Sequence, residues 1–269
     1  MKNLKTNIID RLAKNLNEFE NFKYEPFILF EKNNFLNPED YKILVNEIYS
    51  FDNFEKIFTG KGEKKYKSIN GNNLNNLQNG IFKEFCNFFL STKFYIWFKK
   101  THLPYFKNKN KKNFYIKKPN SYIFRLINKI VKIFNIPVSF FFTEIEYSSI
   151  KNGGFIPPHT DAHNKRLSFV YYLPNNKEKL DVKKREAMGT VFWKPKSSSL
   201  NPLKRFNCAL LEGIEKEKFY QDYEPFHIAT YEENKFVGFI KSDNTWHTVE
   251  PFNFDYDRRA IVINVWEAL

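Results

Sequence analysis

The sequence predicts a mainly β fold with flanking helices (α+β), centred on a double-stranded β-helix, the barrel also called a jelly roll. Up to Pro137 the apolar residues recur mostly at helical spacing, and beyond it they form short β-type runs. About eight such runs follow, which is the number that a jelly roll needs. The runs cover residues 138–148, 166–173, 189–194, 207–212, 226–230, 236–241, 246–250 and 258–266.

The length of the chain suits a single domain. Its 269 residues are enough for one sizeable hydrophobic core, and we expect one compact unit over residues 1–269. Within it, residues 1–137 are expected to form a mostly helical buttress and residues 138–269 the jelly-roll core. No internal repeat or extended low-complexity tract is evident.

The first elements of the expected buttress are an amphipathic helix over residues 1–23 and a strand at Pro26–Phe30. A second helix is expected to run to about Tyr49. Its start is well marked, because Asn37 is a natural N-cap and Pro38 suits the first helical position.

The remainder of the buttress alternates between polar and aromatic segments. Residues 52–78 are polar and predict a loop near the rim of a pocket. A helix is expected from about Gly80 to Lys100, with a break near Ser91-Thr92, and another from about Ser121 to Phe134. Their aromatic stripes are expected to pack against one face of the barrel as core.

Three side chains have the residue types and spacing of a metal site. His159 and Asp161 are two positions apart, so on one strand both side chains point to the same face. Pro157-Pro158 confine His159 to the beginning of that strand. His247 has to reach the same point from a separate strand. Two imidazoles and one carboxylate hold non-heme Fe(II) and leave coordination positions open.

Three other histidines were weighed against this set. His163 continues the strand face of Asp161 and is a rival ligand, although the polar residues around it indicate a position past the strand end. His102 and His227 have no partner at ligand spacing, so a structural role is expected for both.

A basic residue shortly after the last candidate ligand indicates where an anionic co-substrate would bind. Positions 258, 260, 262 and 264 share one strand face. If that face looks inward, Arg258 is the inward cation and Arg259 points out; the sequence leaves this choice open. A buried guanidinium has to be paired, and its planar fork suits a carboxylate.

Several motifs surround these residues in a fixed order. They are Glu146-Tyr147, Gly153-Gly154, the segments 157–161, 166–174, 188–192 and 242–251, and the run from Arg258 to Trp266. Together they resemble the core of the Fe(II)/2-oxoglutarate-dependent dioxygenases, particularly the prolyl-hydroxylase-like branch. The resemblance covers about half the chain, and Met188-Gly189 departs mildly from the Gly-Gly that is common there.

The resemblance implies an oxidative activity. His159, Asp161 and His247 would be the catalytic metal ligands for Fe(II), on neighbouring strands at the mouth of the barrel. 2-Oxoglutarate and O₂ would be co-substrates, with ascorbate as an accessory reductant. The products would be succinate, CO₂ and a hydroxylated small molecule, sugar or peptidyl side chain.

The same resemblance implies how the co-substrate is held. Arg258 would bind the distal carboxylate of 2-oxoglutarate. Tyr172 would donate its hydroxyl to that carboxylate, and Tyr147 would line the pocket. The chain has 15 tyrosines, so a packing role for either is an equal expectation.

The formal net charge of +13 admits a nucleic-acid or anionic-surface partner. Most of the excess is lysine spread along the chain, as AT-rich coding produces, and the basic run at residues 107–112 is expected to be a solvated loop. A nucleic-acid demethylase of the same superfamily is therefore one alternative but is not favoured. The other alternative is a non-catalytic, cupin-like protein that binds a metal or a sugar.

Cysteine content and hydropathy bear on location. Cys86 and Cys208, without a Cys-x-x-Cys motif, argue against a disulfide framework or a zinc ribbon. No apolar run reaches the ~18 residues that span a bilayer, and the start lacks a signal-peptide pattern. We therefore expect a soluble, cytoplasmic protein without a membrane partner.

Overall fold

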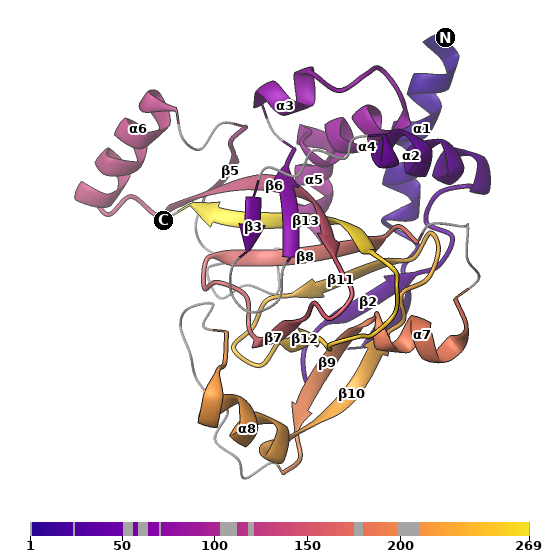
Figure 1. The fold of residues 1–269 in the computed structure, drawn as a ribbon. Coiled ribbons are helices and arrows are strands. Elements are labelled where there is room, and N and C mark those ends of the chain that lie inside the picture. The colour runs from indigo at the N-terminus through magenta and orange to yellow at the C-terminus, as the bar shows by residue number, and fades with distance from the viewer. Residues whose placement is uncertain are drawn as a thin grey trace.

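The computed structural model describes residues 2–23, 25–50, 56–58, 64–69, 71–102, 112–117, 121–174, 180–197 and 210–268. Its helices are α1 (Lys2–Asn15), α2 (Pro38–Tyr49), α3 (Gly71–Asn75), α4 (Ile81–Phe89), α5 (Thr92–Thr101), α6 (Tyr122–Ile133), α7 (Val182–Ala187) and α8 (Gly213–Asp222). Most of them lie to one side of the strands, as Figure 1 shows.

The strands of the described residues form two sheets. The larger contains β1 (Glu20–Lys23), β2 (Leu29–Lys32), β3 (Lys56–Phe58), β4 (Lys64–Ser68), β5 (Lys112–Tyr115), β6 (Val138–Ile150), β8 (Lys165–Tyr172), β11 (Phe236–Ile240) and β13 (Arg258–Ala268). The smaller contains β7 (Ile156–His159), β9 (Thr190–Pro195), β10 (Tyr223–Ala229) and β12 (Trp246–Val249).

The two sheets pack face to face as a jelly roll. In the larger sheet the order is β1-β2-β11-β8-β13-β6-β4-β3, with β5 beside β6, and in the smaller it is β10-β9-β12-β7. Apart from the parallel β5–β6 pair, the pairings are antiparallel. The predicted fold class is therefore confirmed.

Buried side chains form three layers of core. Helices α1, α2, α4 and α5 cover the outer face of the larger sheet, where Phe89 packs on Phe169. Between the sheets, Phe192 meets Phe239 with ring centroids 5.3 Å apart. Helix α8 covers the outer face of the smaller sheet through Phe219. Because both faces of the larger sheet are covered, its central strands are held firmly around the space between the sheets.

Several local predictions are confirmed. The side chain of Asn37 accepts a hydrogen bond from the Asp40 amide and caps α2. Ser91 does the same for α5, so the predicted helix is broken where expected. Seven of the eight predicted runs correspond to β6, β8, β9, β10, β11, β12 and β13.

Other predictions are wrong near the start of the chain. Helix α1 ends at Asn15, and β1 occupies residues that the helix was expected to include. Strand β2 begins at Leu29 rather than Pro26. In both cases pairing decides the outcome, because β1 and β11 hydrogen-bond to the two edges of β2.

The polar segment 52–78 is not simply a loop. Strand β4 pairs along β6 from Lys64↔Ile150 to Ser68↔Glu146, and β3 pairs with β4. Backbone hydrogen bonds to an open sheet edge do not require apolar side chains. The polar composition therefore wrongly indicated a loop where β3 and β4 form. Of the predicted run 207–212, residues 210–212 are not a strand, and residues 207–209 lie outside the described residues.

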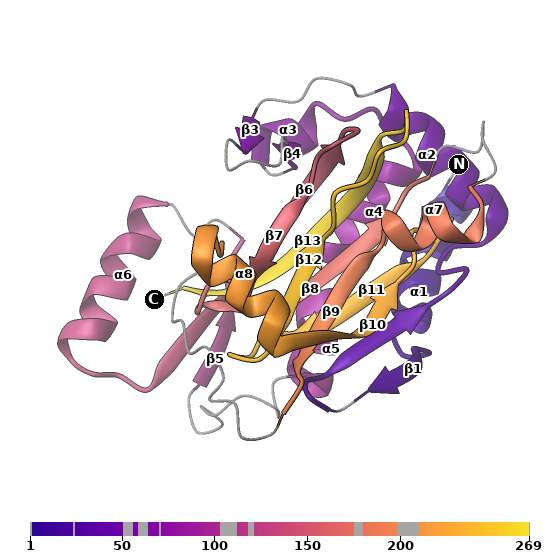
Figure 2. The same ribbon diagram turned by 60° about the horizontal axis from the view of Figure 1, so that its bottom comes forward.

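Helix α6 has the predicted extent but not the predicted role. Its only buried residue is Phe124, which meets Phe140 at a ring-centroid distance of 5.2 Å. Figure 2 shows the helix standing away from the barrel, so it does not buttress the sheet as expected.

Candidate active site

The three candidate ligands come together between β7 and β12. His159 is the last residue of β7 and the direct cross-strand partner of His247 in β12. Their ring centroids are 4.1 Å apart. One ligand atom from each of these residues and from Asp161 lies within 4.8 Å of the other two, and all three side chains are buried.

The local backbone differs from the sequence argument. His159 was expected to begin a strand shared with Asp161, but β7 ends at His159 and Asp161 follows in irregular backbone. The irregular backbone after β7, rather than strand alternation, therefore brings the carboxylate beside the two imidazoles.

The tautomer of each candidate histidine is fixed by the backbone. Nδ1 of His159 lies 2.9 Å from the Pro157 carbonyl oxygen, and Nδ1 of His247 lies 3.0 Å from that of Thr245. A carbonyl can only accept, so each Nδ1 carries the hydrogen when the ring is neutral. Nε2 is left unprotonated on both rings, which is the state that a metal needs.

Charge at the site also suits a cation. Burial, together with the nearby His247, lowers the pKa of His159 to about 3, and burial lowers the pKa of His247. Burial by itself would raise the pKa of Asp161, but Lys165 and the two histidines hold it below its ordinary value. Two neutral imidazoles and one carboxylate are therefore present at neutral pH, ready to coordinate without losing protons.

The carboxylate of Asp161 is held from two sides. Lys165 Nζ lies 2.7 Å from Oδ1, and the Ser168 hydroxyl donates to Oδ2 at 2.8 Å. The ammonium of Lys165 also lies over the Trp266 ring, 5.1 Å from its centroid. These contacts orient Asp161, and they place a cation on one of the oxygens that a metal would use.

A cavity of about 280 Å³ adjoins the three ligands. Among its lining residues Thr190 and Arg258 are buried, whereas Lys64, Glu146 and Trp266 are partly exposed. The cavity is therefore a pocket between the sheets that opens on one side.

Arg258 is the arginine that lines this cavity. Its side chain is buried, Nε donates to the Met188 carbonyl at 2.6 Å, and Nη2 donates to the Thr190 hydroxyl at 3.1 Å. Among the described residues, no carboxylate lies within 4.0 Å of its guanidinium. A buried cation with only neutral partners favours an anion in the cavity.

Arg259 lies on the opposite face of β13. Its guanidinium stacks over the Tyr49 ring at 4.2 Å and donates to the Tyr147 hydroxyl at 3.0 Å. Tyr147 was expected to line the pocket, but it packs in the helix-side core and is not a lining residue. Its neighbours Glu146 and Ser148 line the cavity instead, because side chains alternate along β6.

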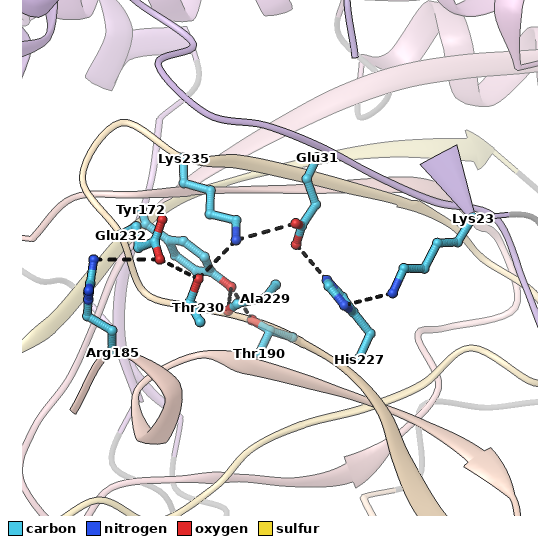
Figure 3. A network of polar contacts seen from close by, with 10 residues as sticks. All are labelled: Lys23, Glu31, Tyr172, Arg185, Thr190, His227, Ala229, Thr230, Glu232 and Lys235. Atoms are coloured by element: carbon cyan, nitrogen blue, oxygen red, sulfur yellow. Dashed lines mark hydrogen bonds and ion pairs between the residues drawn. The ribbon is translucent and has the colours of Figure 1, made fainter. Parts of the chain in front are cut away.

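Tyr172 lies behind the cavity wall rather than in it. Its hydroxyl donates to Thr190 Oγ1 at 2.7 Å and lies 3.1 Å from the Ala229 carbonyl oxygen (Figure 3). Its ring lies 5.2 Å below the Arg258 guanidinium carbon. Tyr172 is therefore not among the residues that line the cavity, and its contacts support Thr190 and Arg258.

The remaining histidines lie outside the cluster. His163 is exposed beyond the strand end, and His102 is enclosed by aromatic rings. His227 lies between Glu31, at 2.8 Å, and Lys23, at 3.0 Å (Figure 3). These positions agree with the structural roles expected for His102 and His227.

Sequence reasoning gave no role to several polar residues of the cavity, among them Thr190 and Asn264. Thr190 gave no signal, because a threonine at a strand start is ordinary. Asn264 shares the strand face of Arg258, and this periodicity could have singled it out. It is buried, and its side-chain oxygen has no hydrogen-bond partner among the described residues. Both residues offer polar atoms to a bound molecule.

Comparison with known proteins supports the fold assignment. No known protein family matches the sequence, and neither does any curated protein. Among solved structures, a prolyl 4-hydroxylase from Phytophthora capsici superposes with a TM-score of 0.50 at 12% identity, covering 98% of this chain and 65% of that one.

Two further solved structures match less well. A prolyl hydroxylase from Trichoplax adhaerens, in complex with a hypoxia-inducible-factor peptide, gives a TM-score of 0.45 at 10% identity, covering 98% of this chain and 91% of that one. The epimerase SnoN, solved with Fe3+, alpha-ketoglutarate and nogalamycin RO, gives a TM-score of 0.46 at 9% identity, covering 96% of this chain and 83% of that one. At 12% identity the superposition on the Phytophthora capsici enzyme shows a shared fold, so the chain has the jelly-roll fold of that prolyl 4-hydroxylase.

None of the helices in the described residues combines the length and the apolar character that crossing a bilayer requires.

Proposed function

We propose that the protein is an Fe(II)- and 2-oxoglutarate-dependent oxygenase that hydroxylates a small molecule, a sugar or a peptidyl side chain. The observation that carries the proposal is the composition of one cavity. It is lined by two imidazoles, a carboxylate and a buried arginine that has no acidic partner among the described residues.

The donor set fits the proposed metal. Nε2 of His159, Nε2 of His247 and a carboxylate oxygen of Asp161 would bind Fe(II), in the ligand combination that leaves coordination positions open. With 2-oxoglutarate and O₂ bound, the metal supplies oxidative decarboxylation to succinate and CO₂ coupled to insertion of an oxygen atom into a C–H bond.

The chain's own residues position the reactants. Arg258 would bind the distal carboxylate of 2-oxoglutarate, because a planar guanidinium can donate two parallel hydrogen bonds to it. Thr190 and the Met188 carbonyl fix the orientation of that guanidinium. Burial of this end of the cavity excludes water and strengthens the charge interaction.

The open end of the cavity would receive the substrate. Lys64 and Glu146 form an ion pair at 3.2 Å in the partly exposed lining, and Trp266 adds an aromatic surface to that lining. Asn264 lies deeper and would orient a polar group of the substrate. Such a lining suits a polar substrate with an apolar portion.

We place this activity in one domain and in the reducing cytoplasm, where iron stays ferrous.

Binding of 2-oxoglutarate to protein loaded with Ni(II) tests the proposal without turnover. Calorimetry should show one site in the wild type and none in Asp161→Ala, whereas His163→Ala should behave as wild type. With Fe(II) and air, succinate should form only when 2-oxoglutarate is present.

The alternatives give different results. Metal binding without any keto-acid binding or keto-acid-dependent O₂ consumption would contradict the proposal and favour a cupin-like binding protein. Oligonucleotide binding that weakens steeply with salt would favour the demethylase alternative, because phosphate contacts release counterions.

A further inference from the structure

Helix α6 exposes an apolar surface that the other described residues do not cover. Tyr122 is 77% exposed, Ile123 70%, Ile133 63% and Phe134, just after the helix, 71%. Leu126, Ile127 and Ile130 are also exposed. Figures 1 and 2 agree that the helix stands off the side of the molecule.

The helix is divided into an apolar and a basic side. At 3.6 residues per turn, the exposed apolar residues share one broad side. The polar residues of α6 gather on another side, and they are Arg125, Asn128, Lys129 and Lys132, with no acidic residue among them. Phe124 lies between these sides on the flank that contacts the barrel at Phe140.

The charge of the surrounding segment is uniformly positive. Residues 85–143 contain twelve Lys or Arg and no Asp or Glu, so this segment carries +12 of the formal net charge of +13. The positive charge that looked evenly distributed along the chain is balanced elsewhere by acidic residues. Only the segment that contains α6 is strongly cationic.

We propose that α6 is an interfacial helix that docks the protein on an anionic phospholipid bilayer. A helix with an aliphatic and aromatic side and a Lys/Arg side lies in the plane of the interface, with its apolar side among the acyl chains. Anionic headgroups complement the cations of residues 85–143. A second copy of this chain is disfavoured as the occupant, because it would bring two segments of charge +12 together.

The position of α6 determines which end of the barrel would face the bilayer. The helix leads into β6, whose early residue Phe140 pairs with Ala268 at the end of β13. Trp266 and Lys165, which belong to the partly exposed lining of the cavity, lie at this same end of the barrel. Docking through α6 therefore brings this part of the cavity lining toward the bilayer.

Vesicle flotation tests the proposal on the full chain. Wild-type protein should float with vesicles of phosphatidylserine and phosphatidylcholine, should float much less with phosphatidylcholine alone, and should detach as salt is raised. The double variant Ile123→Glu/Ile130→Glu should bind at least about ten-fold more weakly, because acyl-chain contact requires an apolar side. Lys129→Gln should weaken binding about five-fold, as expected for one cation near an anionic surface.

A matched control separates α6 from exposed isoleucines in general. Ile214 in α8 is 83% exposed, and Ile214→Glu should leave vesicle binding unchanged. Circular dichroism and thermal unfolding check that every variant folds. The proposal would be overturned if the wild type did not bind anionic vesicles, or if the α6 variants bound them as well as the wild type does. It would also be overturned if the protein were a dimer that Ile123→Glu dissociates.

Discussion

His159 and His247 are direct cross-strand partners, 88 positions apart in the sequence, with ring centroids 4.1 Å apart. The pairing of β7 with β12 alone therefore sets two of the three candidate ligands side by side. A slip of one residue in this register would turn one imidazole to the other face of the sheet. The same strand β12 also pairs with β9, which fixes its position from the other edge.

The two arginines at the start of β13 should differ in their effect on 2-oxoglutarate. Arg258→Lys should raise the dissociation constant for 2-oxoglutarate about 10- to 100-fold, because the ammonium cannot replace a bidentate, charge-assisted pair. Arg259→Lys should change it less than about two-fold, because that side chain stacks on Tyr49 outside the cavity. Calorimetry on the Ni(II)-loaded protein measures both. Equal effects, or a larger effect at Arg259, would contradict the assignment.

Tyr172→Phe distinguishes support of the cavity wall from direct binding. The hydroxyl donates to Thr190 inside the core, so its loss should lower the free energy of unfolding by about 1 to 3 kcal/mol. The affinity for 2-oxoglutarate should fall only about three-fold, by loosening of Thr190. Urea denaturation and calorimetry give the two values. If Tyr172→Phe weakened 2-oxoglutarate binding as much as Arg258→Lys does, without lowering the free energy of unfolding, Tyr172 would instead contact 2-oxoglutarate directly.

His102 should make stability depend on pH. Burial lowers its pKa to about 4, and among the described residues neither ring nitrogen has a hydrogen-bond partner. Between pH 6.5 and 4 the unfolded chain binds the proton more readily, so the contribution of this neutral histidine is intact above pH 6.5 and is lost as pH falls.

His102→Phe removes this dependence and keeps the ring packing against Phe30 and Trp97. The variant should gain about 2 kcal/mol more stability, relative to wild type, at pH 5 than at pH 8. Urea denaturation at the two pH values measures the difference. His163→Gln, an exposed histidine, is the control and should show no such gain. A gain of the same size at both pH values would mean that the protonation cost is not the cause.

The parts of the fold that local chemistry determines were predictable from the sequence. Asn37 and Ser91 cap their helices because short polar side chains satisfy free amides wherever a helix begins. Strand alternation correctly separated Arg258 from Arg259, although the sequence could not say which faced inward.

Other features depend on long-range contacts and were not predictable. Strand β4 forms because β6 offers an open edge, not because Lys64 to Ser68 favour a strand. Asp161 reaches the histidines through irregular backbone whose geometry no spacing rule specifies. Tyr172 was assigned to the cavity by resemblance, but Thr190 lies between the Tyr172 hydroxyl and the cavity. Nothing in a single sequence marks that threonine.

Anaerobic titration with Fe(II) is the most direct test of the account, because the convergence of His159, Asp161 and His247 underlies the proposed function. Wild-type protein should bind one Fe(II) per chain, and His163→Ala should bind it equally well. His247→Ala, which keeps the other two ligands, should bind at least about 100-fold more weakly. Saturable Fe(II) binding that survives His247→Ala unchanged, or no binding by the wild type, would contradict it.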